Sequence, residues 1–102
     1  MENSKIIYAI LKTIDDGMDT GKVDEEAISA EGLGISEPRR INILLALESK
    51  GLIEGLMKVN TLNCKDIRCQ KARLTADGMQ YLEENSMMKK AYRILASIRN
   101  LL

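Results

Sequence analysis

The feature that most restricts the fold of this chain is a change of hydrophobic period that occurs twice between residues 36 and 85. Residues 36–51, SEPRRINILLALESKG, follow the three- and four-residue spacing of an amphipathic helix. Residues 52–59 and 71–75 are strand-like, and residues 76–85 return to helical spacing. Because 102 residues are enough for one hydrophobic core, this order predicts a hairpin between helices of a single domain.

Two further helices are predicted before residue 36. Residues 4–16 form an amphipathic helix, with Ser4 as N-cap and Gly17 as C-terminal stop. Its apolar side chains are Ile6, Ile7, Ile10, Leu11 and Ile14. After a polar loop, Asp24 can cap a short second helix in VDEEAIS, which ends before Gly32. The acidic residues that follow Asp24 suit the positive end of the helix dipole.

The third helix has clear boundary signals. Ser36 is a candidate N-cap, Pro38 lies in the first turn, where its missing N–H costs nothing, and Gly51 ends the helix. One broad face is apolar and consists of Ile41, Leu44, Leu45 and Leu47. At about 100° per residue, the opposite face consists of Arg39, Asn42, Ala46 and Lys50, with Arg40 and Ile43 at its flanks. This opposite face is the surface that the helix can offer to a partner.

The two strand-like runs bracket a polar loop, residues 60–70, with the sequence NTLNCKDIRCQ. Two strands joined in this way predict a hairpin with a long basic tip that carries Lys65 and Arg68. Thr75 can cap the helix that follows the second strand. Gly78, in the first turns of that helix, predicts a close approach to the sheet at a point where a side chain would not fit.

The last residues, SMMKKAYRILASIRNLL, predict a final helix with a coiled-coil seam about two heptads long. The seam consists of Met88, Ala91, Leu95, Ile98 and Leu102. Ile94 and Leu101 widen this stripe beyond what a helix lying on its own small domain would need. Two arrangements stay open, a homodimer through the stripe or packing against the first helix of the same chain.

The complete order is helix, helix, helix, strand, basic loop, strand, helix, helix. This order predicts an α+β, mainly α, winged helix-turn-helix with an additional C-terminal helix. The stretches LESKGLIEG and LTADG are typical of such folds at the helix-to-strand and strand-to-helix junctions. We expect a winged-helix domain over residues 1–86 and a C-terminal helix over residues 87–102 that packs on the core or dimerises.

Three stretches resemble the YjcQ family, small proteins of Gram-positive bacteria and their phages. They are YAILKTID, GLIEG and, most strongly, LTADGMQYLEENSMMKKAYRILASIRNLL. The resemblance runs from about residue 5 to residue 102 and implies a winged-helix fold. For some members it also implies a structural part in phages. The chain is expected to depart most from its relatives at Cys64, at Cys69 and in the Asp-rich residues 15–26.

The fold predicts double-stranded DNA as the partner of the third helix, whose exposed face enters the major groove in this layout. Arg39 or Arg40 could reach guanine edges or phosphates. Asn42 suits an adenine edge, and Lys50 suits a phosphate. The hairpin adds cations suited to the phosphates that flank the groove: Lys58, Lys65, Arg68, Lys71 and Arg73. The alternative is that these are solvated positions and that the cations protect strand edges from pairing with other chains.

The charge distribution agrees with a modest polyanion binder. Formal net charge is zero, yet residues 38–73 carry eight basic and three acidic side chains. Residues 1–37 carry three and nine, and residues 74–102 carry four and three. Non-specific DNA coating requires many neutralised phosphates, so this pattern favours a specific or modest interaction. The alternative is a chance distribution, because solvated faces need charge of some sign. A protein-interaction or phage assembly module that keeps the fold without binding DNA is the alternative function.

An enzyme is the least favoured class. The chain has no His, which removes the commonest general base and the commonest metal ligand. Cys64 and Cys69 alone cannot complete a structural zinc site unless a dimer pools them, and we expect free thiols rather than a redox switch. The acidic residues do not follow the spacing of a calcium loop. We therefore expect no catalytic residue, no metal and no cofactor.

The location expected from the sequence is cytoplasmic. The N-terminal stretch MENSKIIYAILKTIDDG lacks the basic flank, apolar region and cleavage site of a secretory leader. No apolar run in the sequence approaches the length needed to cross a bilayer, so no membrane interaction is expected.

Overall fold

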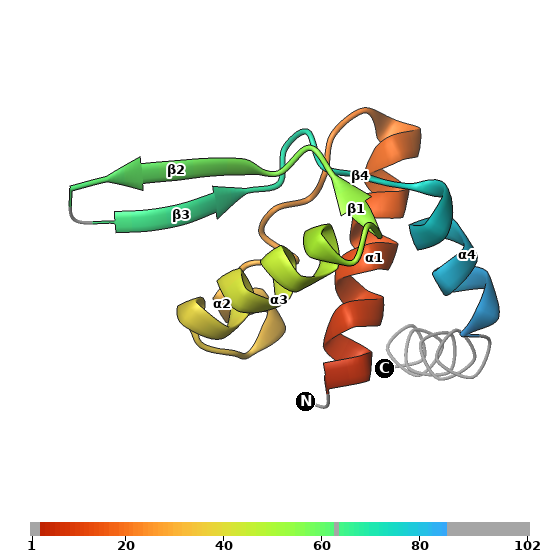
Figure 1. Cartoon of the computed structure of the whole chain (residues 1–102), viewed down its shortest axis with the longest axis horizontal. Helices are drawn as coiled ribbons and strands as arrows, with labels where there is room; N and C mark the ends of the chain where they lie inside the picture. Colours follow the sequence, from red (N-terminus) through yellow and green to blue (C-terminus); the bar gives the residue numbers. More distant parts are fainter. Residues whose placement is uncertain (1–2, 63, 86–102) are drawn as a thin grey trace, which may run out of the picture.

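The computed structural model describes residues 3–62 and 64–85. These residues form an α+β, mainly helical domain (Figure 1). Its elements in chain order are α1 (Asn3–Thr20), α2 (Ala30–Leu33), α3 (Glu37–Ser49), β1 (Ile53–Glu54), β2 (Met57–Thr61), β3 (Cys64–Arg68), β4 (Arg73–Leu74) and α4 (Ala76–Glu84). The order agrees with a winged helix: three helices, a hairpin and a further helix.

Helix α1 occupies the centre of the domain. In Figure 1, α2 and α3 lie on one side of it, α4 lies on the other, and β2 and β3 extend from the body as a ribbon. The core lies between these helices and the base of the hairpin, and it is aliphatic because the chain has no Phe or Trp. Its most completely buried side chains are Ile6, Ile10, Leu11, Ile14, Ile28, Leu44, Ile53 and Cys69.

The first helix is longer than its sequence signals predict. Gly17 does not stop it, because α1 continues to Thr20 and Gly17 is buried within its last turns. A Cβ at Gly17 would lie 2.8 Å from Cα of Val23, which is too close for a real side chain. Gly17 is therefore needed for the returning chain to pack against α1, and the helix ends instead before Gly21, where φ is +84°.

The second helix also differs from its prediction. Asp24 accepts a hydrogen bond from the Ala27 N–H at 3.3 Å, but this bond closes a turn rather than a helix. The helix begins at Ala30, with Ser29 as its N-cap accepting from the Gly32 N–H at 2.9 Å. The predicted boundary was wrong because two capping side chains occur five residues apart and only the second is followed by helix.

Both predicted boundaries of α3 are confirmed. The Ser36 hydroxyl accepts from the Arg39 N–H at 3.3 Å, and Pro38 lies in the first turn. Gly51, with φ of +79°, donates to Glu48 at 3.0 Å, and Leu52 donates to Leu47 at 3.0 Å. This pair of bonds is a Schellman motif, which requires the left-handed conformation that glycine adopts without strain.

The hairpin consists of two short antiparallel ladders, not two strands around a long loop. Residues 60–70 are predicted as loop, but they include β3 and the last residues of β2. The two strands pair from Met57 with Arg68 to Thr61 with Cys64. The second ladder pairs β1 with β4 at the base of the hairpin. Between the ladders, Gly55 has φ of +86°, and a Cβ there would overlap the carbonyl oxygen of Lys71. Only glycine at residue 55 therefore allows the two sides of the hairpin to approach each other this closely.

The junction of β4 and α4 confirms two predictions. The Thr75 hydroxyl accepts from the Gly78 N–H at 3.1 Å, as an N-cap does. A Cβ on Gly78 would overlap the carbonyl oxygen of Leu52, so α4 approaches the base of the hairpin at a point where a side chain does not fit. The Thr75 hydroxyl also donates to the Gly51 carbonyl at 2.5 Å, which fixes the start of α4 to the end of α3.

The predicted C-terminal helix, residues 87–102, lies outside the described residues, as does the predicted boundary at residue 86. Within residues 3–62 and 64–85, none of the helices combines the length and the apolar character that a bilayer span requires.

Candidate nucleic-acid interface

The outer face of α3 is exposed where the sequence predicts it. Arg39, Asn42, Ala46 and Lys50 are all solvent-exposed, and Ile43 at the flank is half-buried. We call Arg39, Asn42, Ala46 and Lys50 the α3 stripe. Arg39 has no acidic partner among the described residues, and its guanidinium donates to the amide oxygen of Asn3. Within residues 3–62 and 64–85, no carboxylate therefore neutralises the cation at the start of the stripe.

Arg40 requires a correction, because the structure removes it from this face. Its side chain is only 6% exposed. Nε donates to the Ile28 carbonyl at 2.8 Å, Nη2 donates to the Ile67 carbonyl at 3.1 Å, and Nη1 lies 3.0 Å from the Glu37 carboxylate. A fully engaged guanidinium is a structural group, and it leaves Arg39 as the arginine that the first turn of α3 presents to solvent.

Two polar links hold the hairpin beside α3. The Arg40 bond to Ile67 joins the start of the helix to β3, and the same guanidinium lies 3.8 Å from Asp66. Near the other end of the helix, Lys58 Nζ in β2 lies 3.0 Å from the Glu48 carboxylate. Helix and ribbon are therefore positioned as one unit, although Lys58 is partly neutralised by this contact.

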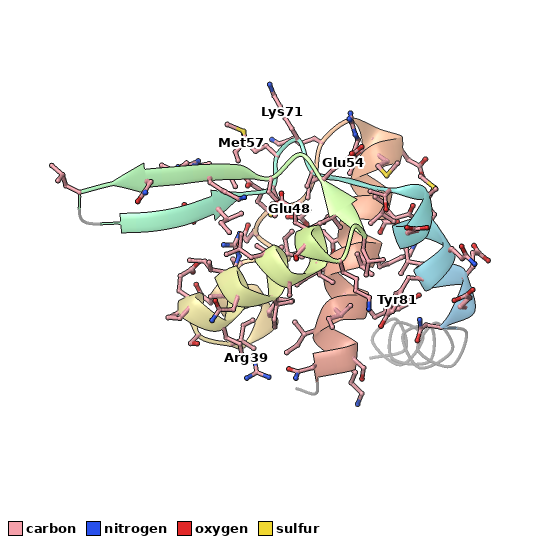
Figure 2. The ribbon with its side chains drawn as sticks, viewed as in Figure 1. Arg39, Glu48, Glu54, Met57, Lys71 and Tyr81 are labelled. Carbon is pink, nitrogen blue, oxygen red and sulfur yellow. The ribbon has the colours of Figure 1, made fainter. Side chains whose placement is uncertain are left out.

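Two of the predicted hairpin cations, Arg68 and Lys71, do not form one surface with the α3 stripe. In Figure 2, Lys71 and Arg39 point to opposite sides of the domain, and Met57 points to the same side as Lys71. Arg68 pairs with Met57, and directly paired residues share a face of a ladder. Arg68 and Lys71 are exposed, but they belong to the face turned away from Arg39.

Of the remaining two predicted cations, one is ion-paired, and the side chain of the other lies outside what the structure describes. Arg73 Nε lies 2.5 Å from the Glu54 carboxylate in the base ladder, so this cation is paired. Lys65 lies in β3 opposite Asn60, and its side chain is outside what the structure describes. Among the described residues, the polar side chains that remain available on the α3 side are therefore Arg39, Asn42, Lys50 and Lys58.

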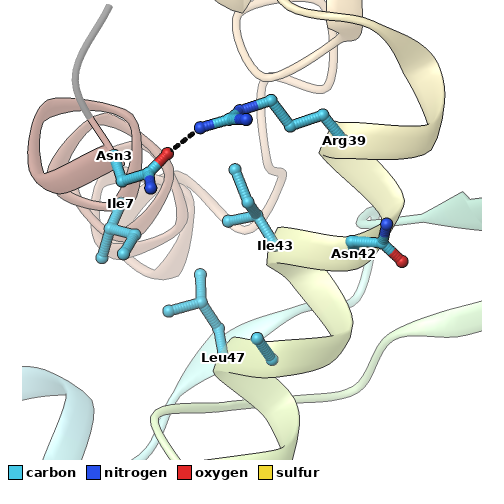
Figure 3. A pocket seen from close by; sticks show the side chains of 7 residues that line it. Asn3, Ile7, Arg39, Asn42, Ile43 and Leu47 are labelled. Carbon is cyan, nitrogen blue, oxygen red and sulfur yellow. Dashed lines mark hydrogen bonds between the residues drawn. The ribbon is translucent and has the colours of Figure 1, made fainter.

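An open groove of about 460 Å³ runs between the stripe and the start of α1 (Figure 3). Its lining residues are Asn3, Ile7, Arg39, Asn42, Ile43, Ala46 and Leu47. Figure 3 shows Ile43 and Leu47 pointing toward α1, while the Arg39–Asn3 hydrogen bond crosses one end. Sequence reasoning missed the contribution of α1, because Asn3 and Ile7 meet α3 only in the folded chain.

Cys69 is a free, completely buried thiol at the base of the hairpin. Burial is the main cause that raises its pKa from 9.0 to about 11, against the opposing effect of Arg40. A thiol of this kind is poorly reactive near neutral pH. The side chain of Cys64 is outside the described set, and in that set no three His, Cys, Asp or Glu side chains gather as a metal site.

Three packed helices, a hairpin fixed beside the third and an exposed polar stripe on that helix define the winged-helix class of small domains. The family model described as YjcQ protein matches residues 8–101. The chain therefore belongs to the YjcQ family, which confirms the resemblance seen in its sequence. No curated protein sequence and no solved structure gives a significant match to the chain.

Proposed function

We propose that this protein binds double-stranded DNA through the α3 stripe and acts as a small bacterial or prophage transcriptional regulator. The observation that carries the proposal is the exposed Arg39, which has no acidic partner among the described residues and stands at the start of an exposed helix face. The hairpin is held beside this face by Arg40 and Lys58. Arg39 would contact a guanine edge or a phosphate, Asn42 an adenine edge and Lys50 a phosphate. Fold-level analogy supplies the groove geometry.

The proposal uses fewer cations than the sequence predicts, and this limits the expected affinity. Arg40 is buried, Arg73 is ion-paired, and Arg68 and Lys71 belong to the opposite face. Because each phosphate contact adds to the salt dependence, few contacts imply modest non-specific binding and a shallow salt slope. We assign no catalytic role to any residue.

Selection from genomic DNA tests the proposal, because the protein itself chooses the sequences that it binds. Purified full-length protein would be incubated with sheared genomic fragments at low salt, and bound fragments would be recovered and sequenced. The proposal expects a small set of enriched sites that share a short motif. Recovery of no fragment above the background of a protein-free control would contradict it.

A second candidate is a protein-interaction module, in keeping with a phage assembly role. The observation that favours it is the apolar floor of the groove between α1 and α3, formed by Ile7, Ile43 and Leu47. DNA offers little to match such a floor, whereas an apolar helix of a partner protein would fill it. Substitution of Ile43 by Glu would abolish such binding, and it would leave contacts made by Arg39 to DNA phosphates in place.

A further inference from the structure

A second pocket, of about 240 Å³, lies between α1 and α4, where these helices pack together on the far side of α1 from α3. It is lined by Tyr8, Lys12, Asp15, Met79, Leu82 and Glu83. Met79 is 42% exposed, which is high for a large apolar side chain beside a core. Leu82 is only partly buried, so α4 presents apolar surface to this pocket.

Acidic side chains stand on both walls of this pocket. Asp15 comes from α1 and Glu83 from α4. The one cation in the lining, Lys12, is already engaged by α1 carboxylates: its Nζ lies 2.9 Å from Asp16 and 3.8 Å from Asp15. The lining of the pocket therefore combines the apolar side chains of Met79 and Leu82 with a carboxylate from each helix, and it suits an apolar segment that carries basic side chains at its borders.

The chain itself contains a segment with these properties. Residues 87–102 include four basic side chains and no acidic one. Drawn as a helix at about 100° per residue, the segment places all its Met, Ile and Leu side chains within about 140° of arc. Lys90 and Arg99 fall at the two borders of that apolar arc, and Lys89 and Arg93 fall on the opposite face.

We propose that residues 87–102 dock in cis into the pocket between α1 and α4. The apolar arc would cover Met79 and Leu82, and Lys90 and Arg99 would face Asp15 and Glu83. The position of the chain supports cis docking, because α4 ends at Glu84 and its own last turn lines the pocket. Docking a segment that starts beside its site costs little entropy, whereas a two-heptad seam between separate chains is marginal.

Cis docking leaves the α3 stripe uncovered and does not depend on DNA binding. The sequence leaves two arrangements open for the C-terminal stripe, a homodimer or packing within one chain. Cis docking corresponds to packing within one chain. A seam used in this way is not available for a homodimer.

Paramagnetic relaxation in the full-length protein tests the proposal. Ala96, opposite the apolar arc, would be changed to Cys and spin-labelled in a Cys64→Ser background, where buried Cys69 reacts poorly. The proposal expects broadening of the Met79 and Leu82 methyl signals in a sample of labelled chains alone. Mixing isotope-labelled chains without the spin label with spin-labelled chains without isotope should give no broadening.

Three results would overturn cis docking. Broadening of equal size in the mixed sample would show that a second copy occupies the pocket. Broadening of Ile43 and Leu47 in place of Met79 would place the segment in the other groove. Absence of broadening at all of these methyl groups would show that the segment is not docked.

A charge variant tests the contacts at the pocket margin. Asp15→Lys combined with Glu83→Lys should weaken docking about tenfold, because two attractive pairs become repulsive. Asp19→Lys is the matched control, since Asp19 is an exposed aspartate on α1 that does not line the pocket. Broadening at Met79 should fall in the double variant and stay unchanged in the control. Equal broadening in both variants would contradict the proposed charge pairing.

Discussion

The guanidinium of Arg40 and the backbone carbonyl of Ile67 lie 3.1 Å apart, nitrogen to oxygen, and this bond joins the first turn of α3 to the hairpin. The same side chain donates to the Ile28 carbonyl, before α2. Arg40 thus connects three segments that are distant in sequence. The position of the hairpin relative to the α3 stripe depends on this residue, which itself offers nothing to a partner.

Replacing Arg40 by Ala is expected to destabilise the domain strongly. The change leaves two backbone carbonyls in the protein interior without their donor, so the free energy of unfolding should fall by about 2–4 kcal/mol. Arg39→Ala is the matched control, because Arg39 is an exposed neighbour, and it should change stability by less than about 0.5 kcal/mol. Urea denaturation of both variants measures the difference, and equal stabilities would refute the structural role of Arg40.

The helix-to-hairpin contact at Gly78 gives a second prediction. Gly78→Ala places a Cβ against the Leu52 carbonyl, a backbone group that cannot move aside without shifting β1, and should cost about 3 kcal/mol. Gly51→Ala is the control for the loss of a glycine, because its Cβ would meet open space. The only cost is the strain of the left-handed backbone, which should lower the free energy of unfolding by about 1 kcal/mol. If thermal unfolding shows Gly51→Ala to be the more damaging change, the close approach of α4 is not a constraint.

The buried thiol of Cys69 predicts a loss of stability at alkaline pH. Its pKa is raised from 9.0 to about 11 in the folded protein, so the folded state retains the proton that the unfolded state releases. This contribution to the free energy of unfolding is complete below pH 9 and is lost as the pH rises from 9 through about 11. A shift of this size corresponds to about 3 kcal/mol. Wild type and Cys69→Ala share every other titrating group, so their stability difference should change only across this window. A pH-independent difference would disprove the shift.

Most of the correct sequence predictions rest on signals that act over a few residues, although two such signals, Gly17 as a helix stop and Asp24 as an N-cap, gave wrong boundaries. The caps at Ser36 and Thr75 depend on a hydroxyl and an N–H three residues away, and both are confirmed. The exposed face of α3 follows from helical spacing alone. The close approach of α4 at Gly78 was also predicted correctly, because a glycine in the first turns of a helix indicates that a side chain would not fit there.

Features that depend on distant partners could not be predicted. Arg40 lies at the flank of the outer face on a helical wheel, and its burial follows from carbonyls at Ile28 and Ile67 that only folding brings near. Residues 60–70 contain few strong strand formers, and their strand conformation comes from pairing across the hairpin. The separation of Lys71 from Arg39 likewise follows from which face of the hairpin is turned toward α3.

Salt dependence gives a prediction about the number of phosphate contacts. If the α3 stripe and Lys58 supply the contacts, the logarithm of affinity should fall with the logarithm of salt with a slope of about −2 to −4. A slope near −8 would require the cations on both faces of the hairpin, and it would show that the α3 side alone does not bind DNA. Titrations at several salt concentrations measure this slope.

The most direct test of the proposed DNA interface compares three forms of the full-length protein by fluorescence anisotropy on one selected duplex at about 50 mM salt. The interface predicts measurable binding by the wild type, a loss of about tenfold in affinity for Arg39→Ala, and an affinity within about twofold of wild type for Lys71→Ala. Lys71 is the matched cation because it is exposed on the side opposite Arg39. Equal losses for the two variants, or no binding by the wild type, would contradict the assignment of the α3 stripe as the DNA-binding surface.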